Sequence, residues 1–278
     1  MTSKNEVLAA AMRRLAEAGV TSPRVDAELL LAHVLEVDRG RLITLDAIDA
    51  EDATRYAELI GRRAARDPLQ HLTGRAPFRH LELAVGPGVF IPRPETELLV
   101  DAVLPALQAL AAPTVVDLCS GSGALALAIA DEVPGARVIA VERSATALSW
   151  LRQNARTTPV EVIAADVTDR TPLALLAGTV DVVVSNPPYV PSTTDVDPEV
   201  RADPAEAVYA GADGLSVIPA VIACATELLR PGGSLAMEHD DTHGDVVCDL
   251  LREDGRWDAI TGHRDLTGRP RFVTATRA

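Results

Sequence analysis

The sequence has few cysteines. Only three occur among its 278 residues, at Cys119, Cys224 and Cys248, and no two of them form a CxxC pair. An odd number of widely spaced thiols argues against a disulfide framework and against a zinc site. We therefore expect reduced thiols, no bound metal and a cytoplasmic protein.

Basic side chains are also in the minority. The chain has 26 lysines and arginines against 40 aspartates and glutamates, a formal net charge of −14. Affinity for nucleic acid comes largely from contacts between cationic side chains and phosphates. The composition thus predicts no direct nucleic-acid partner, but it leaves room for a basic protein or a cationic cofactor.

Long apolar runs are absent as well. Asp101 and Pro105 interrupt the best candidate for a membrane span, and the first residues have no apolar core of the signal-peptide kind. No internal repeat or low-complexity tract is visible. Since 47% of the residues are hydrophobic, the chain has ample material for a core, and we expect no association with membranes.

The first quarter of the chain is expected to be helical. Ser3 can begin a helix that ends near Gly19, and Ser22-Pro23 is a typical start of the next one. Further helices are expected over residues 39–45 and 50–66. We interpret residues 1–75 as a small helical bundle, either a module that docks a substrate or a structural cap.

The stretch from 76 to 92 has the pattern of a β-hairpin. Residues 78–85 alternate between apolar and polar, Gly86-Pro87-Gly88 provides a turn, and residues 89–91 supply a returning strand. We expect this hairpin to link the helical bundle to a third segment, residues 93–278.

In that third segment strands and helices alternate. The expected strands cover residues 114–118, 137–142, 160–164, 182–184, 234–238, 257–261 and 271–276. Repeated βα units predict an α/β fold, with a doubly wound, mostly parallel, seven-stranded sheet of the Rossmann-like kind.

A distinctive tetrad follows the fourth of these strands. The apolar run that ends in Val184-Ser185 stops at Asn186-Pro187-Pro188-Tyr189, because proline lacks a donor for the strand ladder. Open α/β sheets bind ligands at the carboxyl ends of their strands. There, the Asn186 side-chain oxygen and a nearby main-chain carbonyl would suit the two donors of a planar –NH2 group, with Tyr189 as a flat neighbour. The alternative is an ordinary turn at a strand end.

A glycine-rich loop follows the first strand, with the sequence Asp117-Leu118-Cys119-Ser120-Gly121-Ser122-Gly123. Its glycines permit a tight turn and a close approach of the backbone to a ligand. Glu142 ends the second strand, where an acid can accept the hydroxyls of a ribose. Together they indicate a cofactor that contains adenosine, and both NAD and S-adenosylmethionine fit.

The acidic surroundings favour S-adenosylmethionine. Asp117 at the entrance of the loop would repel a pyrophosphate, whereas S-adenosylmethionine has a cationic sulfonium and a cationic ammonium. Asp166, after the third strand, could accept from the adenine amine with Val167 packed on the ring, or could simply cap a helix. With a site for an –NH2 group on the next strand, methyl transfer is the better interpretation.

Longer segments carry a specific resemblance. The tetrad 186–189, the loop 117–123, Glu142 and the segments 68–74, 90–97, 213–215 and 265–272 resemble the release factor glutamine methyltransferases, the PrmC/HemK family of class I methyltransferases. The resemblance covers essentially the whole chain. It implies methylation of the side-chain amide of the glutamine in the Gly-Gly-Gln motif of class 1 peptide chain release factors, which modulates translation termination.

The resemblance also implies roles for individual residues. Asn186, Pro187 and Tyr189 would be catalytic, and these residues with Pro188 would bind the substrate glutamine. The expected contacts of S-adenosylmethionine, and of its product S-adenosylhomocysteine, are Asp117, Cys119, Ser120, Gly121, Ser122, Gly123, Glu142, Asp166, Val167 and Asn186. We expect a monomer whose partners are release factors.

Several alternatives stay open. A related enzyme could methylate a glutamine of a ribosomal protein, and a more distant one an exocyclic amine of nucleic acid, which the net charge disfavours. The segment 238–244 departs from the family's usual Glu-His-Gly, which places the contacts of that loop in doubt. Its His239 and His243 have a spacing seen in metal sites, but no third ligand is evident. Arg93 could contact the substrate or pair with Glu95 or Glu97.

Overall fold

The computed structural model describes residues 1–278, and contacts divide the chain into two compact units. The first unit consists of residues 1–75 together with 196–202, and the second of residues 76–195 and 203–278. The short segment 196–202 was not expected in the first unit, because it follows the Asn-Pro-Pro-Tyr tetrad in the chain. None of the helices combines the length and the apolar character needed to cross a bilayer.

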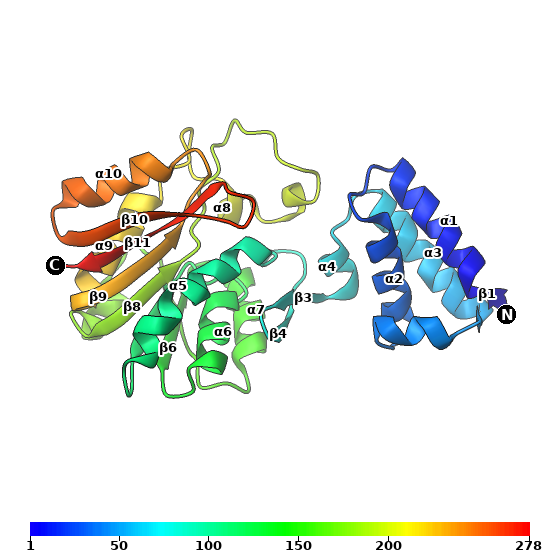
Figure 1. Cartoon of the computed structure of the whole chain (residues 1–278), viewed down its shortest axis with the longest axis horizontal. Helices are drawn as coiled ribbons and strands as arrows, with labels where there is room; N and C mark the ends of the chain where they lie inside the picture. Colours follow the sequence, from blue (N-terminus) through cyan, green and yellow to red (C-terminus); the bar gives the residue numbers. More distant parts are fainter. The chain divides into compact units, whose positions relative to one another are not determined.

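The first unit is a helical bundle (Figure 1). Its elements are α1 (Lys4–Glu17), α2 (Pro23–Val34), the 3-10 helix η1 (Arg39–Thr44), α3 (Ala50–Ala64) and α4 (Leu69–Thr73), with short paired strands β1 (Thr2–Ser3) and β2 (Ala47–Ile48). Pro23 begins α2, as the Ser-Pro start predicts. The buried side chains of Leu15, Leu30, Leu31 and Tyr56 form the centre of its core.

A partly buried cluster of ion pairs connects residues 196–202 to this bundle. Arg63 lies 2.7 Å from Asp26 and 2.8 Å from Glu199, and Arg66 lies 2.6 Å from Glu199. Burial alone would raise the pKa of Glu199, but the hydrogen bonds from Arg66 and Arg63 outweigh it and hold that pKa at about 2. Glu199 therefore stays ionised and holds the segment in the first unit.

A buried tyrosine hydroxyl forms one of the hydrogen bonds between α3 and α2. Tyr56 is 1% exposed, and its hydroxyl donates to the Ala27 carbonyl at 2.9 Å. Tyr56→Phe should lower the free energy of unfolding by about 1 kcal/mol, because one buried hydrogen bond is lost. Urea unfolding followed by far-UV circular dichroism would measure this. The control is Tyr209→Phe, whose half-buried hydroxyl makes no hydrogen bond; an equal loss in both variants would contradict the assignment.

The second unit starts with a hairpin that differs from the expected one. Its strands are β3 (Arg75–Phe78) and β4 (Leu81–Ala84), joined by the two-residue turn Arg79-His80 with Arg79 at φ 52°. A turn is present at 86–88, closed by a hydrogen bond from the Val89 amide to the Gly86 carbonyl at 3.3 Å. It does not join the strands of the hairpin, however, and the predicted strand at 89–91 is wrong. Glycine at 86 also allows close packing, since a Cβ there would lie 2.6 Å from the Trp150 ring of a neighbouring helix.

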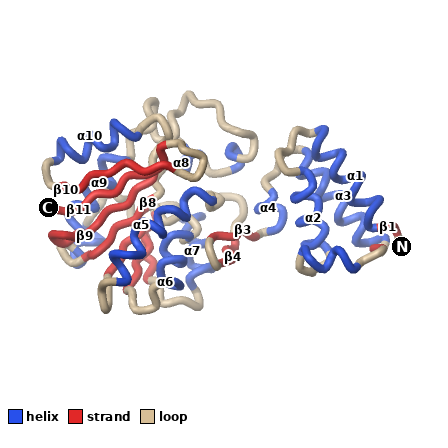
Figure 2. The backbone as a smooth tube through the Cα atoms, in the orientation of Figure 1, coloured by secondary structure: helices blue, strands red, loops and turns tan.

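The remainder of the second unit is the expected α/β fold (Figures 1 and 2). Its strands are β5 (Thr114–Leu118), β6 (Arg137–Glu142), β7 (Glu161–Ala164), β8 (Val180–Ser185), β9 (Leu229–Glu238), β10 (Trp257–Arg264) and β11 (Pro270–Arg277). They form one seven-stranded sheet in the order β10-β11-β9-β8-β5-β6-β7. The pairs among β5 to β9 are parallel, and β11 runs antiparallel to both β9 and β10.

Helices cover both faces of this sheet. On one face lie η2 (Pro94–Thr96), α5 (Glu97–Gln108), α6 (Ala124–Glu132) and α7 (Ala145–Ala155). The other face is covered by η3 (Thr171–Leu176), α9 (Ile218–Leu228) and α10 (Gly244–Asp254). The connection after β8 contains η4 (Val200–Ala202) and α8 (Ala205–Val208). Successive residues of one strand face opposite sides: Val182 and Val184 pack into the first core, and Val183 into the second. Burial on both faces explains the continuous valine run of β8.

Candidate active site

Four neighbouring strands deliver the predicted residues to one edge of the sheet. β8, β5, β6 and β7 are adjacent and parallel. Asn186 directly follows β8, the glycine-rich loop follows β5, Glu142 ends β6, and Asp166 comes two residues after β7. Because parallel strands end at the same edge, these groups gather at the carboxyl side, where such sheets bind their ligands.

Hydrogen bonds hold the glycine-rich loop in a fixed shape. The Ser120 hydroxyl donates to the Asp117 carbonyl at 2.8 Å and accepts from the Val141 amide at 3.0 Å. The Gly121 amide donates to Glu142 at 2.8 Å. Asn154 of α7 donates to the Ser122 carbonyl at 3.0 Å. The loop is thus preorganised by contacts from β6 and α7.

The loop has room for a ligand at one glycine only. Gly121 has φ 56°, and a Cβ built on it would meet no atom within 4 Å, so the space beside it is open. Gly123, at φ 89°, is required for packing instead, since a Cβ there would overlap Leu151. A side chain at 121 would fill the open space, so the bare backbone keeps it accessible.

Asp117 contributes a buried, unpartnered acceptor below the loop. Its Oδ2 accepts from the Ala126 amide at 3.2 Å, while Oδ1 has no hydrogen-bond partner. Burial raises the pKa of Asp117 to about 7. A cationic ligand nearby would lower this pKa again and offset the cost of the buried charge. The orphaned oxygen and the open space at Gly121 fit the cationic S-adenosylmethionine better than they fit a pyrophosphate.

Glu142 and Asp166 are both engaged with the backbone. Glu142 accepts from the Gly121 amide with one oxygen and from the Arg143 and Ser144 amides with the other. A carboxylate has about four acceptor positions, so capacity remains for a ribose hydroxyl. Asp166 accepts from the amide and hydroxyl of Thr168 and pairs with Arg143. Asp166 caps no helix, because the next one, η3, begins at Thr171; it fixes a turn instead. Its role at the adenine stays a prediction, as does that of the buried Val167.

Cys119 has the properties of a packing residue. It adopts φ 62°, a conformation uncommon for residues other than glycine. Burial raises the pKa of its thiol, and the charges of Glu142 and Asp117 raise it further. A thiol that does not ionise is a poor nucleophile, so covalent chemistry at Cys119 is disfavoured.

The Asn-Pro-Pro-Tyr tetrad lies on a buried hydrogen-bond network. The Asn186 Nδ2 donates to the Thr96 hydroxyl oxygen at 3.1 Å, and the Thr96 hydroxyl donates to Glu238 Oε2 at 2.7 Å. Tyr189 donates to Glu238 Oε1 at 2.7 Å. Since the nitrogen end of the Asn186 amide is occupied, its oxygen end is the one left for a ligand.

Sequence reasoning missed Thr96 and Glu238. Thr96 belongs to a segment that carried the family resemblance and Glu238 to the segment 238–244 that departs from it, and no role was predicted for either side chain. Thr96 is 3% exposed and Glu238 is fully buried. Burial raises the pKa of Glu238 to about 7, against the opposing effect of its hydrogen bonds from Tyr189 and Thr96. A buried acid at the end of a central strand was the available signal.

The connection after the tetrad is packed closely on Tyr189. Val190 and Tyr209 form an isolated parallel bridge. Gly214, at φ 76°, is so close that a Cβ on it would overlap the Tyr189 carbonyl oxygen and lie 2.7 Å from the His243 ring. This contact explains why the Asp213-Gly214-Leu215 segment has a glycine in its centre.

Two further predictions concern residues beside the network. Arg93 contacts Asp203, not Glu95 or Glu97: it donates to the Asp203 carboxylate, which also accepts from the Ile91 amide at 3.1 Å. His239 bonds the Asp240 carbonyl through Nδ1, and its Nε2 has no partner. No group of three or more histidine, cysteine, aspartate or glutamate side chains is arranged to hold a metal ion.

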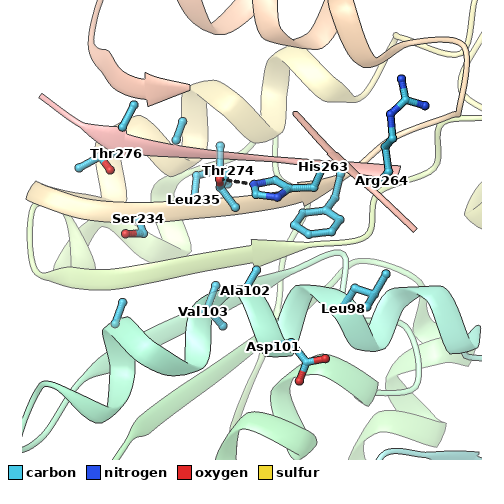
Figure 3. A pocket seen from close by; sticks show the side chains of 14 residues that line it. Leu98, Asp101, Ala102, Val103, Ser234, Leu235, His263, Arg264, Thr274 and Thr276 are labelled. Carbon is cyan, nitrogen blue, oxygen red and sulfur yellow. Dashed lines mark hydrogen bonds between the residues drawn. The ribbon is translucent and has the colours of Figure 1, made fainter. Parts of the chain in front are cut away.

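A separate hollow of about 550 Å³ lies between α5 and strands β9 to β11 (Figure 3). His263 stacks on Phe272 at 4.5 Å and hydrogen-bonds Thr274 at 2.7 Å within it. None of the residues predicted to bind cofactor or substrate lines it. It is therefore a feature apart from the candidate active site.

Family models match two parts of the chain. The model described as PrmC N-terminal domain matches residues 6–74, and the one described as methyltransferase small domain matches residues 81–202. Among solved structures, the T. thermophilus 16S rRNA N2 G1207 methyltransferase in complex with AdoMet and guanosine has a TM-score of 0.52. It is 21% identical and covers 73% of this chain, which covers 50% of it. This likeness supports the class I methyltransferase fold.

Curated relatives match over the full length. The release factor glutamine methyltransferase of Mycolicibacterium smegmatis is 53% identical, with 100% of this chain and 99% of the relative covered. That of Streptomyces coelicolor is 50% identical over 98% of this chain and 97% of the relative. The segments that resembled this family in the sequence are thus part of a similarity that spans both units, and the chain belongs to the release factor glutamine methyltransferase family.

Proposed function

We propose that the protein transfers a methyl group from S-adenosylmethionine to the side-chain amide nitrogen of the glutamine in the Gly-Gly-Gln motif of class 1 peptide chain release factors. The observation that carries the proposal is the Asn186 amide. Its nitrogen is held by Thr96, so its oxygen is available at the carboxyl end of β8, one strand away from the glycine-rich loop. The full-length relatives bear the name of this activity.

Residues around the loop would hold the cofactor. The backbone of 119–123 would lie against its methionine part, Asp117 below the loop would favour its positive charge, and Glu142 would accept from the ribose. Asp166 and Val167 would border the adenine. When bound, S-adenosylmethionine supplies a methyl group on a sulfonium, which is open to attack by a nucleophile.

The tetrad would make a poor nucleophile competent. An amide nitrogen has its lone pair delocalised into the carbonyl, so positive charge develops on it as the new bond forms. The Asn186 Oδ1 and the Pro187 carbonyl would accept from the two N–H groups of the substrate amide and stabilise that charge. Pro188 stiffens the backbone, and Tyr189 would pack beside the glutamine side chain. Holding the nitrogen in line with the methyl group lowers the barrier further, and the N-methylated amide then loses its extra proton readily.

The first unit is proposed to dock the release factor. Its bundle over residues 1–75 is matched by the PrmC N-terminal domain model. It also holds residues 196–202, which lie seven residues beyond Tyr189 in the chain, through Glu199. Binding of a release factor to this unit would therefore affect the position of residues 196–202, which follow the tetrad in the chain. We further propose that the enzyme acts in the cytoplasm as a monomer, without a nucleic-acid or membrane partner.

The proposal is tested with labelled S-adenosylmethionine. The purified protein would be incubated with a class 1 release factor and with its Gly-Gly-Ala variant. We expect label in the wild-type factor only, because alanine lacks the acceptor nitrogen. Label in both factors would contradict the target residue. Label in neither, with transfer to a ribosomal protein or to RNA, would replace the proposed substrate by that one.

A further inference from the structure

Glu238 lies where it can control both polar members of the tetrad. It is the last residue of β9, paired in register with Phe272 of β11, and it is fully buried. One of its oxygens accepts from Thr96 and the other from Tyr189, each at 2.7 Å. Thr96 in turn accepts from Asn186 at 3.1 Å. A single carboxylate is therefore bonded to Tyr189 directly and to Asn186 through one hydroxyl.

The chain of bonds has a direction. A threonine hydroxyl has one proton. When Glu238 is ionised it can only accept, so the Thr96 proton is given to Glu238 and the Thr96 oxygen is left to accept. Only the –NH2 end of the Asn186 amide can donate to that oxygen. The two ends of the amide are nearly equal in size, and this network distinguishes them.

We propose that Glu238 and Thr96 are positioning residues for methyl transfer, which fix the Asn186 amide with its oxygen toward the substrate nitrogen and hold Tyr189 beside it. The inference rests on the proposed function, because it concerns how the acceptor site for a primary amide is oriented. Neither residue has a contact with a reacting atom; each acts through Asn186 or Tyr189.

The ionisation of Glu238 then affects turnover. Protonated Glu238 would become a donor to Thr96 or Tyr189, and the enforced direction would be lost. Burial raises the pKa of Glu238 to about 7; the positive Arg271 of β11 lowers it, and the negative Glu95 of η2 raises it. The Tyr189 hydroxyl, whose own pKa is raised well above its usual value by burial and by Glu238, stays a donor. His239 is the next residue in the chain, and burial lowers its pKa. The active form is the carboxylate, so kcat should fall as the pH is lowered through about 7.

Thr96→Val tests the hydroxyl without changing the size of the side chain. We expect kcat for methylation of the release factor to fall at least tenfold, with the dissociation constant of S-adenosylhomocysteine changed by less than about twofold. Thr96→Ser retains the hydroxyl and should retain most of the rate. The matched control is Thr226→Val: Thr226 is also 3% exposed, and its hydroxyl donates to the Ile222 carbonyl in α9. This control should keep the wild-type kcat.

Glu238→Gln tests the direction itself. The glutamine –NH2 would donate to Thr96, and the Thr96 hydroxyl could then donate to the Asn186 oxygen. The Asn186 side-chain amide would therefore flip, with its nitrogen toward the substrate. We expect a loss of kcat as large as that of Thr96→Val, and no change of kcat near pH 7, where the wild type should show one. Wild-type kcat in Thr96→Val, or a wild-type pH profile in Glu238→Gln, would overturn the inference. A wild-type protein that methylates no release factor would instead remove the proposed function, and the inference with it.

Discussion

Asn186→Ala is expected to lower kcat for methylation of the release factor by about a hundredfold. The variant removes the side-chain acceptor for the substrate –NH2 group, and the loss of one preorganised polar group at the point where charge develops typically costs a factor of this size. Affinity for S-adenosylhomocysteine should fall far less, because Asn186 is only one of the expected cofactor contacts and the loop 119–123 and Glu142 are held by bonds that do not involve it. Single-turnover transfer of a labelled methyl group and titration calorimetry would measure the two quantities.

Asn186→Asp separates the acceptor from its orientation. Aspartate keeps an oxygen for the substrate, but it cannot donate to Thr96, whose single proton is already given to Glu238. It also adds a second negative charge close to a buried carboxylate. We therefore expect kcat to fall about as far as in the alanine variant. The control for Asn186→Ala is Asn5→Ala, at an exposed asparagine of α1, which should leave kcat unchanged. Near-normal turnover of Asn186→Ala would contradict the role of the tetrad.

The sheet could be predicted from the sequence because its signals are local. Each central strand is a short apolar run that stops at a polar residue, as β8 does at Asn186. The order of βα units then places the ends of these strands at one edge. The hairpin was predicted at the wrong turn because apolar alternation continues past Arg79-His80. Its glycines at 86 and 88 are required by close packing on Trp150 and Thr146, which no local pattern reveals.

The network behind the tetrad depends on distant contacts. Thr96 precedes Asn186 by 90 residues, and Glu238 follows Thr96 by 142. Nothing in the spacing of these residues indicates that their side chains meet. The same applies to Glu199, which joins the first unit through Arg63 and Arg66, more than 130 residues before it in the chain. Local sequence patterns therefore indicated the residues proposed to contact the ligands, such as Asn186. The residues that orient Asn186, namely Thr96 and Glu238, could be identified only from the folded structure.

Gly214→Ala is expected to lower kcat about a hundredfold relative to the wild type, although Gly214 has no proposed contact with either substrate. Its φ of 76° is unfavourable for alanine, and the added Cβ would overlap the Tyr189 carbonyl oxygen and lie 3.0 Å from Pro191. The carbonyl is part of the backbone, so the clash is relieved only by moving the backbone of one of the two segments, and we expect the tetrad to be displaced. A displacement of about 1 Å at a reacting site can cost about a hundredfold in rate.

Gly255→Ala distinguishes this displacement from backbone strain alone. Gly255 follows α10 at φ 71°, and a Cβ there would meet no atom within 4 Å. Both variants should lose about 1 kcal/mol of stability, since alanine is strained in the left-handed region. Only Gly214→Ala has the clash, so only that variant should lose turnover and show additional destabilisation in thermal unfolding. Equal kcat in the two variants would mean that the tetrad tolerates the movement and that its backbone position is not critical for methyl transfer.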